Sequence, residues 1–303
     1  MLEFFRWQPD NKHFYFKGIS LALYITCVVI SFFAVILIWI FKNPIHIWYN
    51  SKSIHLGTLS SKSLKILIGS ITIVFMSMRS LILWFAKYPN IYEIIPFHLC
   101  RLMLLFTALS LVFNKVNLIK YFGPIAIIGC IIALLLPSFD FVPATKPQKI
   151  GIDSVYYYDY ILCHCFLLII TSMLLATHRI QIKAKDLLIT TIFFICLALI
   201  MFNINLVTYI YAPKGWQTNY LYLGKDEVNS QSNLFGVLSK WPWNLFTWTI
   251  LGLIFYSIFV AIWIVQDKVQ IDFMNRKMSI SVKKSDRWIE FKNCQHVNNI
   301  QNK

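Results

Sequence analysis

Charged residues are scarce in this sequence. Of its 303 residues only 14% are charged, against roughly 25% in soluble domains, and 58% are hydrophobic. This composition excludes an ordinary water-soluble domain. Acidic residues are especially few, 13 against 28 Lys and Arg, which leaves a net charge of +15. No nucleic-acid-binding motif accompanies the basic residues, so we interpret them as a signal of membrane topology and expect no nucleic acid partner.

Glycine and cysteine are also sparse. The 10 glycines are scattered and form no loop that would hold nucleotide phosphates, so we expect no cofactor of that kind. The 7 cysteines are an odd number, and Cys27, Cys130 and Cys196 lie inside apolar runs. Free cysteine in such surroundings acts as a small hydrophobic residue. A disulfide scaffold is therefore not expected.

Long apolar runs, in contrast, are abundant. A bilayer core of about 30 Å requires roughly 20 helical residues, and seven runs reach about that length. Their continuous apolar character, without strict alternation, favours helices over a barrel. The first run lacks the features of a cleaved signal peptide, so we expect it to be retained. We predict an all-α multi-pass membrane protein with seven transmembrane helices over residues 18–41, 64–85, 94–113, 118–137, 157–176, 187–211 and 243–265.

Seven spans place the two termini on opposite sides of the membrane. The side that carries the C-terminus has sixteen Lys and Arg in its connecting segments and at the span ends, and the other side has nine. By the positive-inside rule, we expect the N-terminus outside and the C-terminus in the cytoplasm of a cell-membrane protein. The chain then divides into an extracytoplasmic segment (1–17), the transmembrane domain (18–265) and a basic, solvated cytoplasmic tail (266–303).

Strongly polar residues inside the predicted spans gather at one depth. Counted from the outer end of each span, they lie roughly 9 to 12 Å below the outer boundary. Such residues are costly in lipid and are functional candidates by default. The inner halves of the spans hold no comparable set, so we expect a pocket open to the outer side. The layer comprises Arg79, Cys100, Arg101, His164, Asn203 and Asn205, with His98 half a turn above Cys100.

Each of these residues also has a structural explanation. An arginine near a span end can extend to the lipid headgroups, and asparagines can join helices by hydrogen bonds. Cys100 taken alone is typical of a core residue. His164 is the hardest to explain in this way, because an imidazole in an apolar stretch needs a polar partner.

The polar layer contains groups suited to acyl transfer. A cysteine is a nucleophile only as the thiolate, and His164 is placed to take the proton from Cys100. The thiolate would attack a lipid ester, giving a thioester, while Asn203, Asn205 or Arg79 stabilises the oxyanion. Ester carbonyls lie just beneath the headgroups, at a matching depth. The two arginines, with few carboxylates nearby, favour a phosphate, so the predicted substrate is a membrane glycerophospholipid. Glu93 and Asp159, the acids at the outer ends, leave open that either pairs with an arginine instead.

A metal site at the same level is less favoured. His98, Cys100 and His164 are all possible ligands. Successive residues on a helix point about 100° apart, so Cys163, His164 and Cys165 cannot converge on one ion. His98 and Cys100 are about 200° apart by the same geometry. We therefore predict no metal.

Three stretches resemble a known family. The sequence EIIPFHLCR at 93–101 resembles the E-x-x-P-L-H-L-C element of the YwaF family of bacterial seven-span membrane proteins. NYLYL at 219–223, followed by WPW at 241–243, resembles that family's N-Y-M-x-L and P-W-P-W elements. The region from Asp159 to His164 resembles its fifth-span histidine region. The likeness covers about residues 15–265 in the number and order of spans.

This resemblance implies an activity. The YwaF family is similar to a vertebrate multi-pass acyltransferase that remodels phospholipids through a cysteine and a histidine. It implies that Cys100 is the acyl-accepting cysteine and His164 the histidine. The sequence departs from the family pattern at Phe97, where Leu is usual, and at 224–228, where GKDEV replaces a basic, proline-containing sequence.

Three functions remain open on the sequence. The leading hypothesis is acyl transfer on glycerophospholipid by Cys100 and His164, with His98, the arginines and the asparagines of the layer binding substrate. A transporter or sensor would instead hold an anionic solute or lipid through Arg79 and Arg101. A structural assembly subunit would need none of these groups. The outer loop 212–240 would either cover the pocket or lie on the headgroups, and no protein partner is identified.

Overall fold

The computed structural model describes residues 3–5, 15–55, 57–86, 88, 90–137, 150–225, 236–274, 277–282 and 288–289. Seven helices in this part of the chain are long and apolar enough to cross a membrane, which confirms the predicted fold class. Two of these spans begin with short 3-10 turns, η2 (Ile91–Ile94) and η3 (Val116–Leu118). The seven main helices are α1 (Ile19–Ile40), α3 (Ser61–Phe85), α4 (Leu99–Val112), α5 (Ile119–Leu135), α6 (Val155–Thr177), α7 (Ala184–Tyr211) and α9 (Trp243–Val265).

Shorter elements lie between and beyond the spans. Helix α2 (Lys42–Ser51) follows α1 almost directly, and β1 (Ile54–His55) pairs antiparallel with β2 (Leu59–Ser60) before α3 begins. The remaining elements are four 3-10 turns: η1 (Glu3–Phe5), η4 (Tyr220–Tyr222), η5 (Gly236–Ser239) and η6 (Gln266–Lys268).

The C-terminal segment corrects one expectation. The stretch after α9 was expected to be a solvated tail without regular structure. Most of its described side chains are exposed, but β3 (Val269–Met274) and β4 (Lys277–Val282) form an antiparallel hairpin there, with Val269 opposite Val282. The sequence explains it, because apolar residues alternate with polar ones in both strands. Residues 283–287 and 290–303 of the tail lie outside the described residues.

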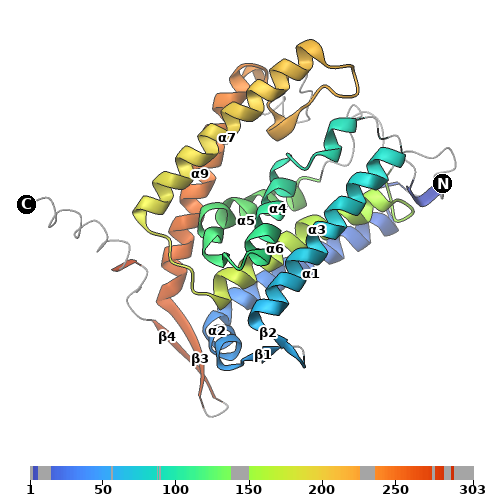
Figure 1. Ribbon diagram of the computed structural model, residues 1–303. Coiled ribbons are helices and arrows are strands. Elements are labelled where there is room, and N and C mark those ends of the chain that lie inside the picture. The colour runs from blue at the N-terminus through green and yellow to red at the C-terminus, as the bar shows by residue number, and fades with distance from the viewer. Residues whose placement is uncertain are drawn as a thin grey trace, which may run out of the picture.

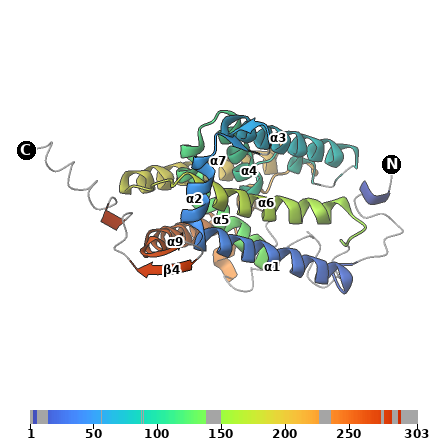
Figure 2. The same ribbon diagram turned by 90° about the horizontal axis from the view of Figure 1, so that it is seen from below.

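Helix α6 is the centre of the bundle. It packs against α1, α2, α4 and α5, and Figure 2 shows α1 and α3 on opposite sides of it. Helices α7 and α9 lie beyond α5, which contacts both (Figure 1). Of the seven spans, α6 is the most enclosed by protein, whereas α1 and α7 are among the least.

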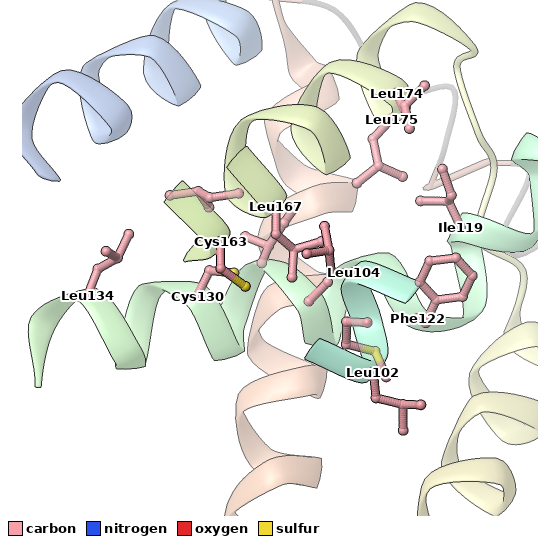
Figure 3. Close-up of a cluster of buried hydrophobic side chains, with 14 of the residues drawn as sticks. Leu102, Leu104, Ile119, Phe122, Cys130, Leu134, Cys163, Leu167, Leu174 and Leu175 are labelled. Carbon is pink, nitrogen blue, oxygen red and sulfur yellow. The ribbon is translucent and has the colours of Figure 1, made fainter. Parts of the chain in front are cut away.

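The main apolar core of the described residues joins α4, α5 and α6. Because these three helices pack side by side, their facing side chains are almost fully buried (Figure 3). The outer faces of α1, α3, α7 and α9 instead expose many large apolar residues, as expected for surfaces that contact lipid. The labelled core residues are Leu102, Leu104, Ile119, Phe122, Cys130, Leu134, Cys163, Leu167, Leu174 and Leu175.

The bundle has two polar ends, the site end and the tail end. At the site end, α3 finishes at Phe85 and α6 begins at Val155. At the tail end, α1, α6 and α9 finish at Ile40, Thr177 and Val265. The assignment of the tail end to the cytoplasm stays a prediction from the distribution of Lys and Arg.

Candidate functional site

Helix α4 begins later than the predicted span. Its first residue is Leu99, and Ile95 and His98 before it have extended backbones (φ −86°, ψ 123° and φ −65°, ψ 145°). Pro96 explains the delay, because a proline disfavours helical backbone in the residue that precedes it. Cys100 therefore lies in the first turn of α4. The depth predicted for Cys100 and Arg101 assumed a continuous helix from residue 94. It has to be corrected, because residues 95–98 are not helical.

The thiol of Cys100 lies beside two polar groups from neighbouring helices. It lies near the imidazole of His164 on α6 and the thiol of Cys130 on α5. Cys100 is half-buried, while His164 is 7% exposed. On α5, the sulfur of Cys100 lies beside Gly129, 3.5 Å from the position that a Cβ would take there. The structure thus brings the predicted nucleophile and base together.

The orientation of His164 suits it to accept a proton. Its Nδ1 lies 2.7 Å from the carbonyl oxygen of Tyr160, one turn earlier on α6. A carbonyl can only accept a hydrogen bond, so Nδ1 carries the hydrogen and Nε2 keeps its lone pair. The ring of Tyr160 packs on the imidazole with centroids 4.3 Å apart, and its hydroxyl donates to Ala133 O at 2.6 Å. These contacts hold the imidazole in one orientation.

The two arginines of the polar layer are paired with acids. Arg101 donates to Oδ2 of Asp159, and Arg79 Nε donates to the same oxygen at 3.0 Å. Arg79 also donates to Oε2 of Glu93 at 3.1 Å and to its backbone oxygen at 2.8 Å. The pairing of an arginine with Glu93 or Asp159, which the sequence left open as an alternative to phosphate binding, is what the structure shows. Two cations and two anions form one chain of ion pairs with balanced charge.

The imidazole of His98 packs among tyrosines. His98 is the residue before the first turn of α4, and its ring centroid lies 6.2 Å from that of Tyr92, 5.9 Å from Tyr220 and 5.7 Å from Tyr222. Its Nε2 is buried and has no hydrogen-bond partner among the described residues. These contacts make it part of an aromatic cluster that covers the start of α4.

The two asparagines of α7 have different roles. Asn203 is exposed, and its amide donates to Leu199 O at 2.7 Å on its own helix, so the structure does not bring it to the thiol. Asn205 is buried and holds the chain after α7. Its Oδ1 accepts from Tyr220 N and from Thr218 Oγ1, both at 2.9 Å, and its Nδ2 donates to Tyr220 O at 2.9 Å.

The chain that Asn205 holds packs on the protein at the site end. Tyr220 is 1% exposed, and its hydroxyl donates to Tyr92 O at 2.8 Å. Leu221 and Tyr222 adopt left-handed backbone (φ 56° and 58°), which non-glycine residues rarely do without such fixed surroundings. For the described part of the outer loop, a cover over the start of α4 fits better than a segment lying on the headgroups. Residues 226–235 of that loop lie outside the described residues.

Two residues of the site were not recognised as such from the sequence. Cys130 was interpreted as a core residue, and its proximity to Cys100 depends on the packing of α5 against α4. Figure 3 shows it beside Cys163 of α6 within the core. Tyr160 precedes His164 by one helical turn, and that spacing was the available signal. Among the described residues, no three His, Cys, Asp or Glu side chains are grouped as a metal site.

The family of the chain follows from comparison with known families. A model of the TMEM164 family, a family of multi-pass membrane proteins, matches residues 12–260. The chain belongs to the TMEM164 family. The match includes Cys100 and His164 and the loop that covers the start of α4. Curated proteins and solved structures gave no match. The likeness to the YwaF family stays a prediction.

Proposed function

We propose that this TMEM164-family protein is an acyltransferase or transacylase of the cell membrane that moves fatty acyl groups between glycerophospholipids through a thioester on Cys100. One observation carries the proposal. The thiol of Cys100 lies beside an imidazole, that of His164, whose Nδ1 is held by a carbonyl and whose Nε2 is left to accept a proton. This is the arrangement that an activated cysteine nucleophile requires.

The reaction has two steps with His164 as the proton carrier. First, His164 takes the thiol proton and the sulfur of Cys100 attacks the ester carbonyl of the donor lipid. The carbon–oxygen bond breaks, and the leaving alkoxide takes the proton from the imidazolium, which gives a lysophospholipid and the thioester. Second, His164 takes the proton from a hydroxyl of the acceptor lysophospholipid. That oxygen attacks the thioester, and the sulfur leaves and regains its proton.

The start of α4 supports charge development on both the sulfur and the oxyanion. Cys100 lies in the first turn, where the backbone N–H groups have no acceptor within the helix and the helix dipole favours negative charge. A thiolate at a helix N-terminus is stabilised for this reason. The same N–H groups are candidates for the oxyanion hole. This role was expected of Asn203 and Asn205, but Asn203 points away and the amide of Asn205 is occupied.

The ion pairs support a positioning role for the arginines. Arg101 follows Cys100 on α4, and Asp159 lies five residues before His164 on α6. The Arg101–Asp159 pair therefore ties the helix of the nucleophile to the helix of the base. Balanced charge also weakens the alternative of a transporter or sensor that binds an anion through Arg79 and Arg101. For both reasons acyl transfer is the better-supported function.

Lipid analysis of cells provides the test. Cells that produce the wild-type protein, Cys100→Ala, His164→Gln or the control Cys196→Ala would be compared at equal protein levels. Cys196 is an exposed cysteine on α7 and should be silent. We expect the first two variants to lose the phospholipid acyl-chain profile of the wild type. Unchanged profiles in both would remove the proposal.

A further inference from the structure

A pocket lies at the tail end, away from the acyl-transfer site. It is a shallow hollow of about 320 Å³ including the open solvent at its mouth, and its enclosed part has room for about one water molecule. It is formed where α1, α6 and α9 finish and α2 begins. From His164 to the end of α6 the helix runs thirteen residues, or about 20 Å, so the two places are well separated. The described lining includes Trp39, Lys42, Asn43, Arg179, Trp263 and Gln266.

Two buried donors of this pocket have no acceptor. Trp39 Nε1 and Gln266 Nε2 make no hydrogen bond within the described structure. The other polar atoms of Gln266 are occupied, since Lys42 Nζ donates both to its backbone oxygen at 2.6 Å and to its side-chain oxygen. A buried N–H without an acceptor is unfavourable and calls for an explanation. A bound group rich in acceptors would provide one.

The positive charge of Arg179 faces the same pocket. Arg179 lies two residues after the end of α6 and donates through Nη2 to Asn43 Oδ1 at 3.0 Å. Asn43 is neutral, and this bond uses one of the five N–H groups of the guanidinium. None of the described residues that line the pocket is acidic. In this respect Arg179 differs from Arg79 and Arg101, whose carboxylate partners balance them.

The donor set selects the ligand class. An arginine, an indole N–H and an amide N–H all require acceptors, and an arginine fork matches phosphate oxygens. Three spans finish here, which places the pocket at headgroup level. If this side is cytoplasmic, as the Lys and Arg count predicts, it faces the leaflet that carries anionic lipids.

We propose that this pocket binds a phosphate group, carried by an anionic lipid headgroup or by free phosphate. The C-terminal ends of helices bear partial negative charge and favour cations. Lys42 and Arg179 are therefore also suited to cap α1, α6 and α9. Lys42 does donate to the end of α9, at Gln266 O. Binding must therefore be measured directly.

The experiment uses the full chain with Cys100→Ala, so that no acyl transfer contributes heat. The purified protein in neutral detergent is titrated in a calorimeter with dihexanoyl phosphatidylglycerol and, separately, with inorganic phosphate. Arg179→Gln is compared with Lys185→Gln, which removes the same charge from an exposed residue near the same end. We expect Arg179→Gln to weaken binding roughly tenfold or more, the loss of a charge-assisted pair, and Lys185→Gln by less than about twofold.

The outcomes separate the sources of phosphate. Binding of the lipid alone supports a headgroup site, and equal binding of inorganic phosphate supports a site for free phosphate. Trp39→Phe removes the N–H together with part of the indole, and should weaken binding of either ligand a few-fold. Because Trp39 packs on Phe259 and Trp263, binding is compared at a temperature well below the melting temperature of the variant. No binding by the parent protein, or equal losses for Arg179→Gln and Lys185→Gln, would overturn the proposal. Because the readout is binding, either result leaves acyl transfer by Cys100 to its own test.

Discussion

The two polar ends of the bundle hold arginines in opposite circumstances. At the site end, Arg79 and Arg101 share the carboxylates of Asp159 and Glu93 in a buried chain of ion pairs. At the tail end, Arg179 is exposed, makes one described hydrogen bond to a neutral amide, and faces a pocket with buried donors that lack acceptors. Whether an arginine near a membrane boundary indicates a ligand site therefore depends on whether carboxylates already pair with it.

This difference changes what each end is suited to do. The ion pairs at the site end, in which Arg101 Nη1 and Asp159 Oδ1 still lack hydrogen bonds to the described residues, fix the relative positions of two helices, which a covalent mechanism between Cys100 and His164 needs. An end with uncommitted donors is suited to bind an anion. The following predictions test the difference, beginning with the largest effect.

Removing a carboxylate at the site end should be strongly destabilising. Asp159→Asn leaves Arg79 and Arg101 buried with one partner fewer, and we expect a loss of about 3 to 5 kcal/mol in the free energy of unfolding. Unfolding in mixed detergent micelles would measure it. Glu93→Gln is the matched control and should cost less, because Arg79 keeps Asp159. A loss below about 1 kcal/mol for Asp159→Asn would contradict a buried, tightly coupled network.

The two asparagines of α7 form a natural pair of variants. Asn205→Ala removes three hydrogen bonds and leaves the backbone of Tyr220 unsatisfied, so we expect a loss of about 2 to 3 kcal/mol. Asn203→Ala should change stability by less than about 0.5 kcal/mol, because its side chain is exposed. Thermal unfolding of the solubilised protein distinguishes them. Equal losses would mean that Asn205 does not hold the loop.

The tail end should show a pH response through His178, which follows the last residue of α6. Burial and the nearby positive charges of Lys65 and His46 lower the pKa of His178 to about 4 from 6.5, and Tyr49 packs on its ring. Between pH 6.5 and 4 the unfolded chain thus binds more protons, so stability is retained above about 6.5 and falls as the pH drops toward 4.

The size of this response is on the order of 1 kcal/mol once solvent screening of a partly exposed ring is allowed for. His178→Gln should remove that part of the pH dependence, while the wild type keeps it. Stability would be followed from pH 7.5 to 4 by thermal unfolding of both proteins. Superimposable curves would show that His178 is accessible and titrates normally in the folded protein.

The smallest effect is expected for Arg179→Gln. This residue is exposed and makes one described hydrogen bond, so its removal should alter the free energy of unfolding by no more than about 0.5 kcal/mol. Arg101→Gln, measured under the same conditions, should cost several times as much because it leaves Asp159 buried with one cation fewer. If both variants lost similar amounts of free energy of unfolding, the difference between the arginines of the site end and the tail end would be contradicted.

Much of the fold was predictable from the sequence because lipid imposes a length on each span. The seven runs were located by apolar length alone, and the structure places a helix in each. The errors have local causes. Pro96 delays the start of α4, and the hairpin of β3 and β4 was missed because its alternation lies within a polar, basic segment.

The site was only partly predictable because its contacts join distant parts of the chain. The pairing of Cys100 with His164 was inferred, and their proximity agrees with it. Asn203 and Asn205 point about 200° apart on one helix, so they cannot share one site, and the sequence did not reveal which faces inward. Arg101 and Asp159 are 58 residues apart, and only the packing of α4 on α6 joins them. The tail-end pocket has the same origin, since three helix ends meet there.

The most direct test of the acyl-transfer account is peptide mass spectrometry of the purified protein after brief incubation with a phospholipid that carries an isotopically labelled acyl chain, quenched in acid. We predict a labelled acyl group on Cys100 that hydroxylamine removes, and its absence from His164→Gln. If no acyl group is found on Cys100, or if Cys27 and Cys196 carry as much, the account is contradicted.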